Sequence, residues 1–132
     1  MTRGRGFLIF YLPLILYLAL VFYMSSGPVT SLVLRSIKDY ILHGTEYCGL
    51  YLLVFRAIHE GLESKPGRGG YWLAAVLTVL YGISDEFHQS FVPTRDASFW
   101  DVMADAAGAM LGIGLIAGWK RAISSYRARR LA

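Results

Sequence analysis

The sequence has few charged residues and almost no cysteine, and both shortages narrow what the protein can be. Charged residues make up 17% of its 132 positions, against about 25% in an ordinary soluble domain. The hydrophobic share is 55%, and a soluble domain this small could not bury so much apolar surface. This composition argues against a soluble globule, a disordered tail or a nucleic-acid-binding module, although the net charge is +4. Cys48 is the single cysteine, which excludes an intrachain disulfide.

In place of charge, the sequence has four long apolar runs. A helix that spans a bilayer needs about 20 mostly apolar residues, and four stretches meet or approach that length. Connectors rich in Gly, Pro and Ser separate them, as expected for turns. The sequence therefore predicts an all-α polytopic membrane protein, a bundle of four transmembrane helices in a single domain. The predicted spans are about residues 7–24, 40–58, 71–91 and 99–119, followed by a basic tail over residues 120–132.

The first run contains no charged residue and has the general form of a secretory signal, because Arg3 and Arg5 precede it. Its apolar stretch is longer than a usual signal core, and no Ala-x-Ala-like cleavage site follows. We therefore expect a membrane helix, with a kink at Pro13 that membrane helices tolerate.

The basic residues are distributed unevenly, and this predicts the orientation of the spans. Lys and Arg gather near the N-terminus, in the second connector and in the C-terminal tail, whereas the first and third connectors hold few of them. Cytoplasmic loops carry the excess of Lys and Arg, so both termini are expected in the cytoplasm. The basic tail is then expected to contact anionic lipid headgroups rather than nucleic acid.

The ionisable residues inside the spans lie at one depth. With this topology and a rise of about 1.5 Å per residue, three helices place such residues about 3–9 Å below their outer ends. A charge that faces lipid at mid-bilayer costs about 2.5–3.5 kcal/mol, so these groups are expected to face one another, water or a ligand. These ionisable residues are His43 and Glu46 on the second span, Asp85 and Glu86 on the third, and Asp101 and Asp105 on the fourth. On the same helical faces lie Tyr47 on the second span and His88 and Gln89 on the third.

Histidines and carboxylates at helical spacing also suit a divalent metal. His43 with Glu46, and Asp85 with His88, each present two ligand groups on one helical face, as metal sites in helix bundles do. Zn²⁺ or Mn²⁺ would fit such a set, although no local stretch matches a known metal signature. Without a metal, carboxylates this close should not all be ionised, and they would suit general acid–base work.

Each of these residues also has a purely structural interpretation. Asp101 follows Ser98 at capping-box spacing and could simply start the fourth helix, which leaves Asp105 unexplained. The histidine–carboxylate pairs could be hydrogen bonds between helices. Gly108 and Gly112 would let the fourth helix pack closely against a neighbour, or would form a stripe through which the chain makes an oligomer.

The polar residues fall in three segments with recognisable motifs. Residues 81–95 read YGISDEFHQSFVPTR, residues 43–47 read HGTEY, and residues 101–112 read DVMADAAGAMLG. Together these segments resemble the VanZ-like family of membrane proteins, with Thr94 where many relatives have Gly and Asp105 where many have Asn. The resemblance implies a protein of the bacterial cytoplasmic membrane, and the founding member of the family is associated with low-level resistance to teicoplanin, a lipoglycopeptide. The resemblance implies no particular reaction.

We expect an outward-facing pocket that engages a lipid-borne polar group, such as a lipid-linked cell-wall precursor, a phospholipid headgroup or a lipoglycopeptide. An enzyme that acts on the same kind of lipid, by acid–base or metal-dependent transfer or hydrolysis, is the main alternative. A transporter would place its site at the midplane, and an assembly module would need no pocket. The candidate catalytic residues are Glu46, Asp85, Glu86 and His88, the candidate binding residues are His43, Tyr47, Gln89, Arg95, Asp101 and Asp105, and the candidate metal ligands are His43, Glu46, Asp85 and His88.

Overall fold

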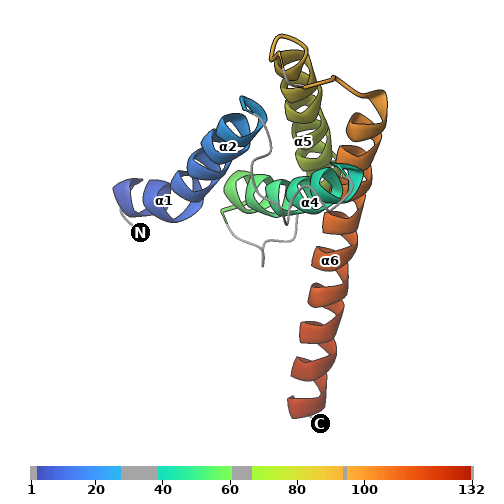
Figure 1. The fold of residues 1–132 in the computed structure, drawn as a ribbon. Helices are drawn as coiled ribbons and strands as arrows, with labels where there is room; N and C mark the ends of the chain where they lie inside the picture. The colour runs from blue at the N-terminus through green and yellow to red at the C-terminus, as the bar shows by residue number, and fades with distance from the viewer. Residues whose placement is uncertain (1–2, 28–38, 61–66, 94, 132) are drawn as a thin grey trace.

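A computed structural model of the chain describes residues 3–27, 39–60, 67–93 and 95–131, and every element within them is a helix (Figure 1). The predicted all-α class is therefore confirmed. Three of the connector residues counted for the orientation, Arg35, Lys38 and Lys65, lie outside the described residues. The helices are α1 (Arg3–Phe10), α2 (Leu12–Ser25), α4 (Asp39–Ile58), α5 (Arg68–Gln89) and α6 (Phe99–Leu131).

The first apolar run is divided into two helices rather than kinked within one. α1 and α2 meet at Tyr11, and Pro13 occupies the first turn of α2. Proline has no N–H to donate to the preceding turn and its ring crowds the carbonyl there. Helical hydrogen bonds nevertheless continue across the junction, since Tyr11 N donates to Phe7 O (2.9 Å) and Ile15 N donates to Tyr11 O (2.9 Å).

α4 lies between the other helices and contacts α2, α5 and α6 (Figure 1). Its closest approach is to α6, where a side chain at Gly108 would meet the backbone carbonyl of Gly44 and the backbone nitrogen of Cys48. One turn further along, Gly112 lies against the ring of Tyr51 in the same way. The predicted close packing of the glycine stripe is thus an α4–α6 contact within the chain, and self-association of the chain stays a prediction.

The core combines large side chains from α4 with mostly small ones, three alanines and one isoleucine, from α5 and α6. This complementarity lets the helix backbones approach one another without leaving voids. The buried core residues are Tyr47, Leu50, Tyr51, Val54 and Phe55 of α4, Ala74 and Ala75 of α5, and Ala109 and Ile116 of α6.

α5 and α6 run in opposite directions. Near the start of α5, the hydroxyl of Tyr71 accepts a hydrogen bond from Nζ of Lys120 (3.0 Å). Near the end of α5, Oε2 of Glu86 accepts a hydrogen bond from the backbone N–H of Ser98, the residue before α6 (2.8 Å). The end of α5 and the start of α6 therefore lie together, as the predicted topology requires.

Among the described helices, α6 is long and apolar enough to cross a membrane, over Phe99–Arg130. α2 is apolar but has only 14 residues, because the proline break separates it from α1. α4 and α5 have 20 and 22 residues, which is sufficient length at about 1.5 Å per residue, but both carry charged side chains. Length and composition therefore support one span, and the four-span arrangement with cytoplasmic termini stays a prediction.

The basic tail is helical rather than a separate segment. α6 continues through residues 120–131 without a break, and its last turns stand clear of the other helices (Figure 1). The side chains of Arg121, Arg127, Arg129 and Arg130 are exposed there. Basic residues in the last turn also favour the negative end of the helix dipole, so the charges that mark the end of the predicted span do not end the helix.

Candidate functional site

The end of α2, the start of α4, the end of α5 and the start of α6 meet at one end of the bundle. Ser26 Oγ, just after α2, lies 3.0 Å from Nε2 of His88 near the end of α5. The predicted polar residues of α4, α5 and α6 gather at this end, and several are almost fully buried. Burial of charged groups is costly unless they are paired, so their surroundings decide what they do. The buried ones are His43, Asp85, Glu86, Gln89 and Asp105.

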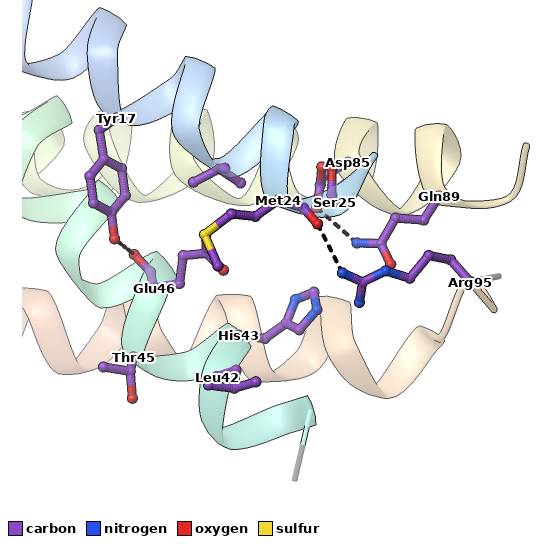
Figure 2. Close-up of a pocket in the computed structure, with 11 residues that line it drawn as sticks. Tyr17, Met24, Ser25, Leu42, His43, Thr45, Glu46, Asp85, Gln89 and Arg95 are labelled. Carbon is purple, nitrogen blue, oxygen red and sulfur yellow. Dashed lines mark hydrogen bonds between the residues drawn. The ribbon is translucent and has the colours of Figure 1, made fainter. Parts of the chain in front are cut away.

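A cavity of about 260 Å³ lies between α2, α4 and α5 (Figure 2). The helices α4 and α5 contribute polar side chains to it, and α2 contributes mainly apolar ones. Two carboxylates, an imidazole, an amide and a guanidinium therefore line one cavity. The predicted site residues that line it are His43, Glu46, Asp85, Gln89 and Arg95.

Asp85 has one occupied and one unoccupied carboxylate oxygen. Its Oδ2 accepts a hydrogen bond from Nε2 of Gln89, one turn later on α5 (2.9 Å). Its Oδ1 is buried and has no hydrogen-bond partner among the described residues. Since an unpaired buried acceptor costs about 1–3 kcal/mol or more, Asp85 is poised to accept a hydrogen bond from a group that enters the cavity.

Arg95 lines the cavity but bonds to the backbone of the α2 end. Its Nη2 donates to the carbonyl of Met24 (2.9 Å) (Figure 2). Its Nε donates to the carbonyl of Gly27 (3.1 Å). A guanidinium near the last carbonyls of a helix completes their hydrogen bonding and favours the dipole. Arg95, a candidate binding residue from the sequence, thus fixes the end of α2 against the loop after α5.

His43 lies between two carboxylates from different helices. Its Nδ1 is 2.9 Å from Oδ1 of Asp105 on α6, and its Nε2 is 3.8 Å from Oε1 of Glu86 on α5. Asp105 is completely buried, and its Oδ2 lies against Gly82, where any side chain would collide with it. The bare backbone at Gly82 therefore makes the space that this buried carboxylate occupies.

The start of α6 brings Asp101 into the same group. Ser98 caps the helix, since its Oγ accepts from the backbone N–H of Trp100 (3.2 Å). In a capping box the third helical residue would accept the bond from the cap's own N–H, but here Glu86 Oε2 accepts it. Ligand atoms of His43, Glu86 and Asp101 all lie within 4.8 Å of one another.

The metal ligands predicted from the sequence are therefore not the ones that the fold groups. Asp85 and Glu86 are neighbours on α5 and point about 100° apart, so one faces the cavity and the other faces α6. Glu46 lines the cavity, and His88 is engaged by Ser26 and by the ring of Phe22, whose centroid lies 4.5 Å from its own. The described residues group His43 with Glu86 and Asp101 instead of with Glu46, Asp85 and His88.

Tyr47, another predicted binding residue, is fully enclosed by the core. Its ring stacks at 6.1 Å from that of His43 and lies 6.5 Å from that of Tyr81, and its hydroxyl has no hydrogen-bond partner among the described residues. It packs behind the polar group and does not line the cavity.

The sequence interpretation missed the contribution of α2. The hydroxyl of Tyr17 donates a hydrogen bond to the backbone carbonyl of Glu46 (2.9 Å) (Figure 2). The hydroxyl of Tyr81 on α5 donates to the carbonyl of Leu18 on α2 (2.7 Å). Together with Met24, Tyr17 also lines the cavity. The sequence feature that could have indicated this contribution is Tyr17 itself, within a mostly apolar run. A buried tyrosine usually needs a hydrogen-bond partner for its hydroxyl.

Comparison with known proteins adds one finding. A family model described as VanZ/LLP1 matches residues 8–121, which includes all three motif segments and every candidate site residue. No curated protein and no solved structure matches the chain.

Proposed function

Because the chain belongs to the VanZ/LLP1 family, we propose that it is a multi-pass protein of the bacterial cytoplasmic membrane whose cavity binds the polar group of a lipid-borne envelope molecule. The VanZ family is membrane-associated. In this proposal both termini lie in the cytoplasm and the cavity opens toward the outer leaflet. In this proposal the residues that bind the ligand are Glu46, Asp85 and Gln89, together with His43 and Arg95, which also line the cavity.

The distribution of side chains supports the membrane part of the proposal. Large apolar residues such as Leu16, Phe87 and Trp100 are 61%, 68% and 73% exposed. A soluble monomer rarely exposes wide apolar patches, and lipid would cover these side chains. The same molecule buries carboxylates in its interior, which is the arrangement expected of ionisable residues in a membrane bundle.

One observation carries the binding part of the proposal: the unpaired Oδ1 of Asp85 in a cavity of about 260 Å³. This volume is slightly below that of typical ligand pockets, about 300–1,000 Å³. It suits the polar group of a larger molecule whose apolar part stays in lipid. Carboxylate oxygens require donors, so the group that enters should carry an ammonium, amide or hydroxyl.

A lipoglycopeptide of the teicoplanin type has this chemistry, because its acyl chain can enter the membrane and its sugars and amines can donate hydrogen bonds. Engagement at the membrane would keep it from its target in the cell wall. We therefore propose that the chain lowers the susceptibility of the bacterium to teicoplanin-type drugs. It would do so by binding either the membrane-inserted drug or the lipid-linked precursor that the drug recognises.

Susceptibility tests would examine this proposal. Expression of the chain in a susceptible bacterium is expected to raise the inhibitory concentration of teicoplanin several-fold, but not that of a glycopeptide without an acyl chain. Asp85→Asn, which replaces the unpaired acceptor with an amide, is expected to abolish the effect at equal protein level.

Asp96→Asn is the matched control, because Asp96 is an exposed aspartate in the loop after α5. It should protect as well as the wild-type chain does. Equal protection against both drugs, undiminished protection by Asp85→Asn, or no protection by the wild type would contradict the proposal.

A second candidate function is an enzyme of the same membrane, and the geometry of His43 favours it. A carboxylate that orients a histidine is a recurring feature of acid–base catalysis, and Asp105 holds His43 at 2.9 Å. His43 also lines the cavity. Turnover of a lipid-linked substrate that is lost in His43→Gln, but retained in His59→Gln, would favour the enzyme over the binding protein.

A further inference from the structure

The hydrogen bond of His43 to Asp105 determines which ring nitrogen carries a proton. Nδ1 lies 2.9 Å from Oδ1 of Asp105, and an ionised carboxylate can only accept. Nδ1 therefore donates, which leaves Nε2 of a neutral imidazole with an unprotonated lone pair. Asp105 is completely buried, so this orientation of the ring is fixed within the packed interior.

The lone pair of Nε2 faces a second acceptor. Oε1 of Glu86 lies 3.8 Å away, beyond hydrogen-bond distance. This oxygen belongs to a residue that is only 5% exposed, so water does not readily reach it. It nevertheless accepts no hydrogen bond within the part of the chain that the structure describes. The other oxygen of the same carboxylate is held in place by the N–H of Ser98. Two acceptors that face one another need a proton, a water molecule or a metal ion between them.

Asp101 adds a third oxygen ligand from a third helix. One of its carboxylate oxygens lies within 4.8 Å of the ligand atoms of both His43 and Glu86. The group thus combines a histidine from α4, a glutamate from α5 and an aspartate from α6. A set of one imidazole and two carboxylates suits divalent ions such as Zn²⁺ and Mn²⁺.

We propose that His43, Glu86 and Asp101 bind a divalent cation of the Zn²⁺ or Mn²⁺ type, with Asp105 as the residue that orients His43. Histidine ligands of metals usually donate their other ring N–H to a carboxylate, which fixes the tautomer. Distances of about 2.0–2.2 Å from a shared ion place ligand atoms about 3–3.5 Å apart, so binding requires small rotations of the carboxylates. The site does not depend on which molecule enters the cavity.

Three protein ligands leave a coordination position open, as in catalytic rather than structural zinc sites. His43 belongs both to this group and to the lining of the cavity (Figure 2). An oxygen of a ligand in the cavity could therefore complete the coordination shell. The alternative without metal is a doubly protonated His43 that pairs with the carboxylates of Glu86 and Asp105. Only the arrangement with metal predicts that the protein takes up added ions.

The test uses the full chain purified in detergent and stripped of metal with a chelator. Zn²⁺ and Mn²⁺ are added separately, bound metal is counted by mass spectrometry after desalting, and the unfolding temperature is followed. We expect about one ion per chain and a rise in Tm of about 5–10 °C at saturating metal. His43→Gln and Glu86→Gln are each expected to lose both the ion and the rise.

Glu86→Gln is expected to fold as the wild type does, because its amide nitrogen can donate to Nε2 of His43. A loss of the ion in this variant therefore cannot be attributed to unfolding. The stripped variant should unfold at or above the temperature of the stripped wild type. His59→Gln and His88→Gln are the matched controls and should retain the ion, because neither histidine belongs to the group. His59, just after α4, bonds to the carbonyl of Gly70 (3.3 Å), and His88 lies 3.0 Å from Oγ of Ser26. A wild-type chain that takes up neither ion, Glu86→Gln that still binds one, or loss of the ion in His88→Gln would overturn the proposal.

Discussion

At the end of the bundle where α5 begins, Lys120 donates to the hydroxyl of Tyr71 (3.0 Å) and lies 5.1 Å from the centres of the rings of Tyr71 and Phe55. At the end where α5 finishes, buried oxygens of three carboxylates accept no hydrogen bond from the described residues. Both ends join α4, α5 and α6 through polar side chains. The first end satisfies its polar groups within the protein, whereas the second leaves acceptors for something else. These acceptors belong to Asp85, Glu86 and Asp105.

This difference separates helix pairing from a binding site. Hydrogen bonds between membrane helices contribute little on average, about 0.6 kcal/mol, and they require donors matched to acceptors. An excess of buried acceptors works against stability. The end that contains Asp85 and Glu86 therefore has the features of a site where stability is exchanged for function, and the end that contains Lys120 has those of a structural junction.

The largest expected effect comes from the contact that supports both ends. In Gly108→Val the new side chain would meet the carbonyl of Gly44, which is backbone and cannot move aside. α4 and α6 would have to separate, at a cost of about 3 kcal/mol or more, and both ends would loosen. Thermal unfolding in detergent measures this. Gly114→Val is the control, because a side chain there meets nothing within 4 Å, and equal Tm values for the two variants would show that the crossing is not tightly packed.

An intermediate effect is expected within the polar end, at the residue that orients His43. Asp105→Ala would leave Nδ1 of His43 as a buried donor without an acceptor, whereas Asp105→Asn keeps an oxygen at that position. We expect the alanine variant to be about 2 kcal/mol less stable than the asparagine variant. Denaturant unfolding of the two proteins side by side gives the comparison. Equal stability would mean that the bond between the helices has no influence on the fold.

The comparison of the two ends also shows what the sequence could predict. Apolar runs, breakers and helical spacing were sufficient to predict the all-α fold, the grouping of polar residues at one end and the close packing of Gly108. They could not distinguish Asp85 from Glu86, because which of two adjacent residues faces the cavity depends on how α5 packs. The approach of Tyr17 to Glu46 depends likewise on the tilt of α2. α6 passes residue 119 without ending, because Lys and Arg are good helix formers and a change to basic composition does not break a helix.

The smallest effects should have opposite signs at the two ends. Lys120→Met loses its bond to Tyr71 and its contacts with the two rings, and we expect the protein to be about 1 kcal/mol less stable. Asp85→Asn removes the unpaired buried acceptor and keeps the oxygen to which Gln89 donates, so it should unfold at or slightly above the wild-type temperature, as substitutions at functional sites often do. Unfolding temperatures of the two variants and the wild type, measured in one detergent, decide this. If Asp85→Asn lowers Tm as much as Lys120→Met does, the carboxylates at that end pair helices as Lys120 does, and the difference between the ends is one of geometry rather than of function.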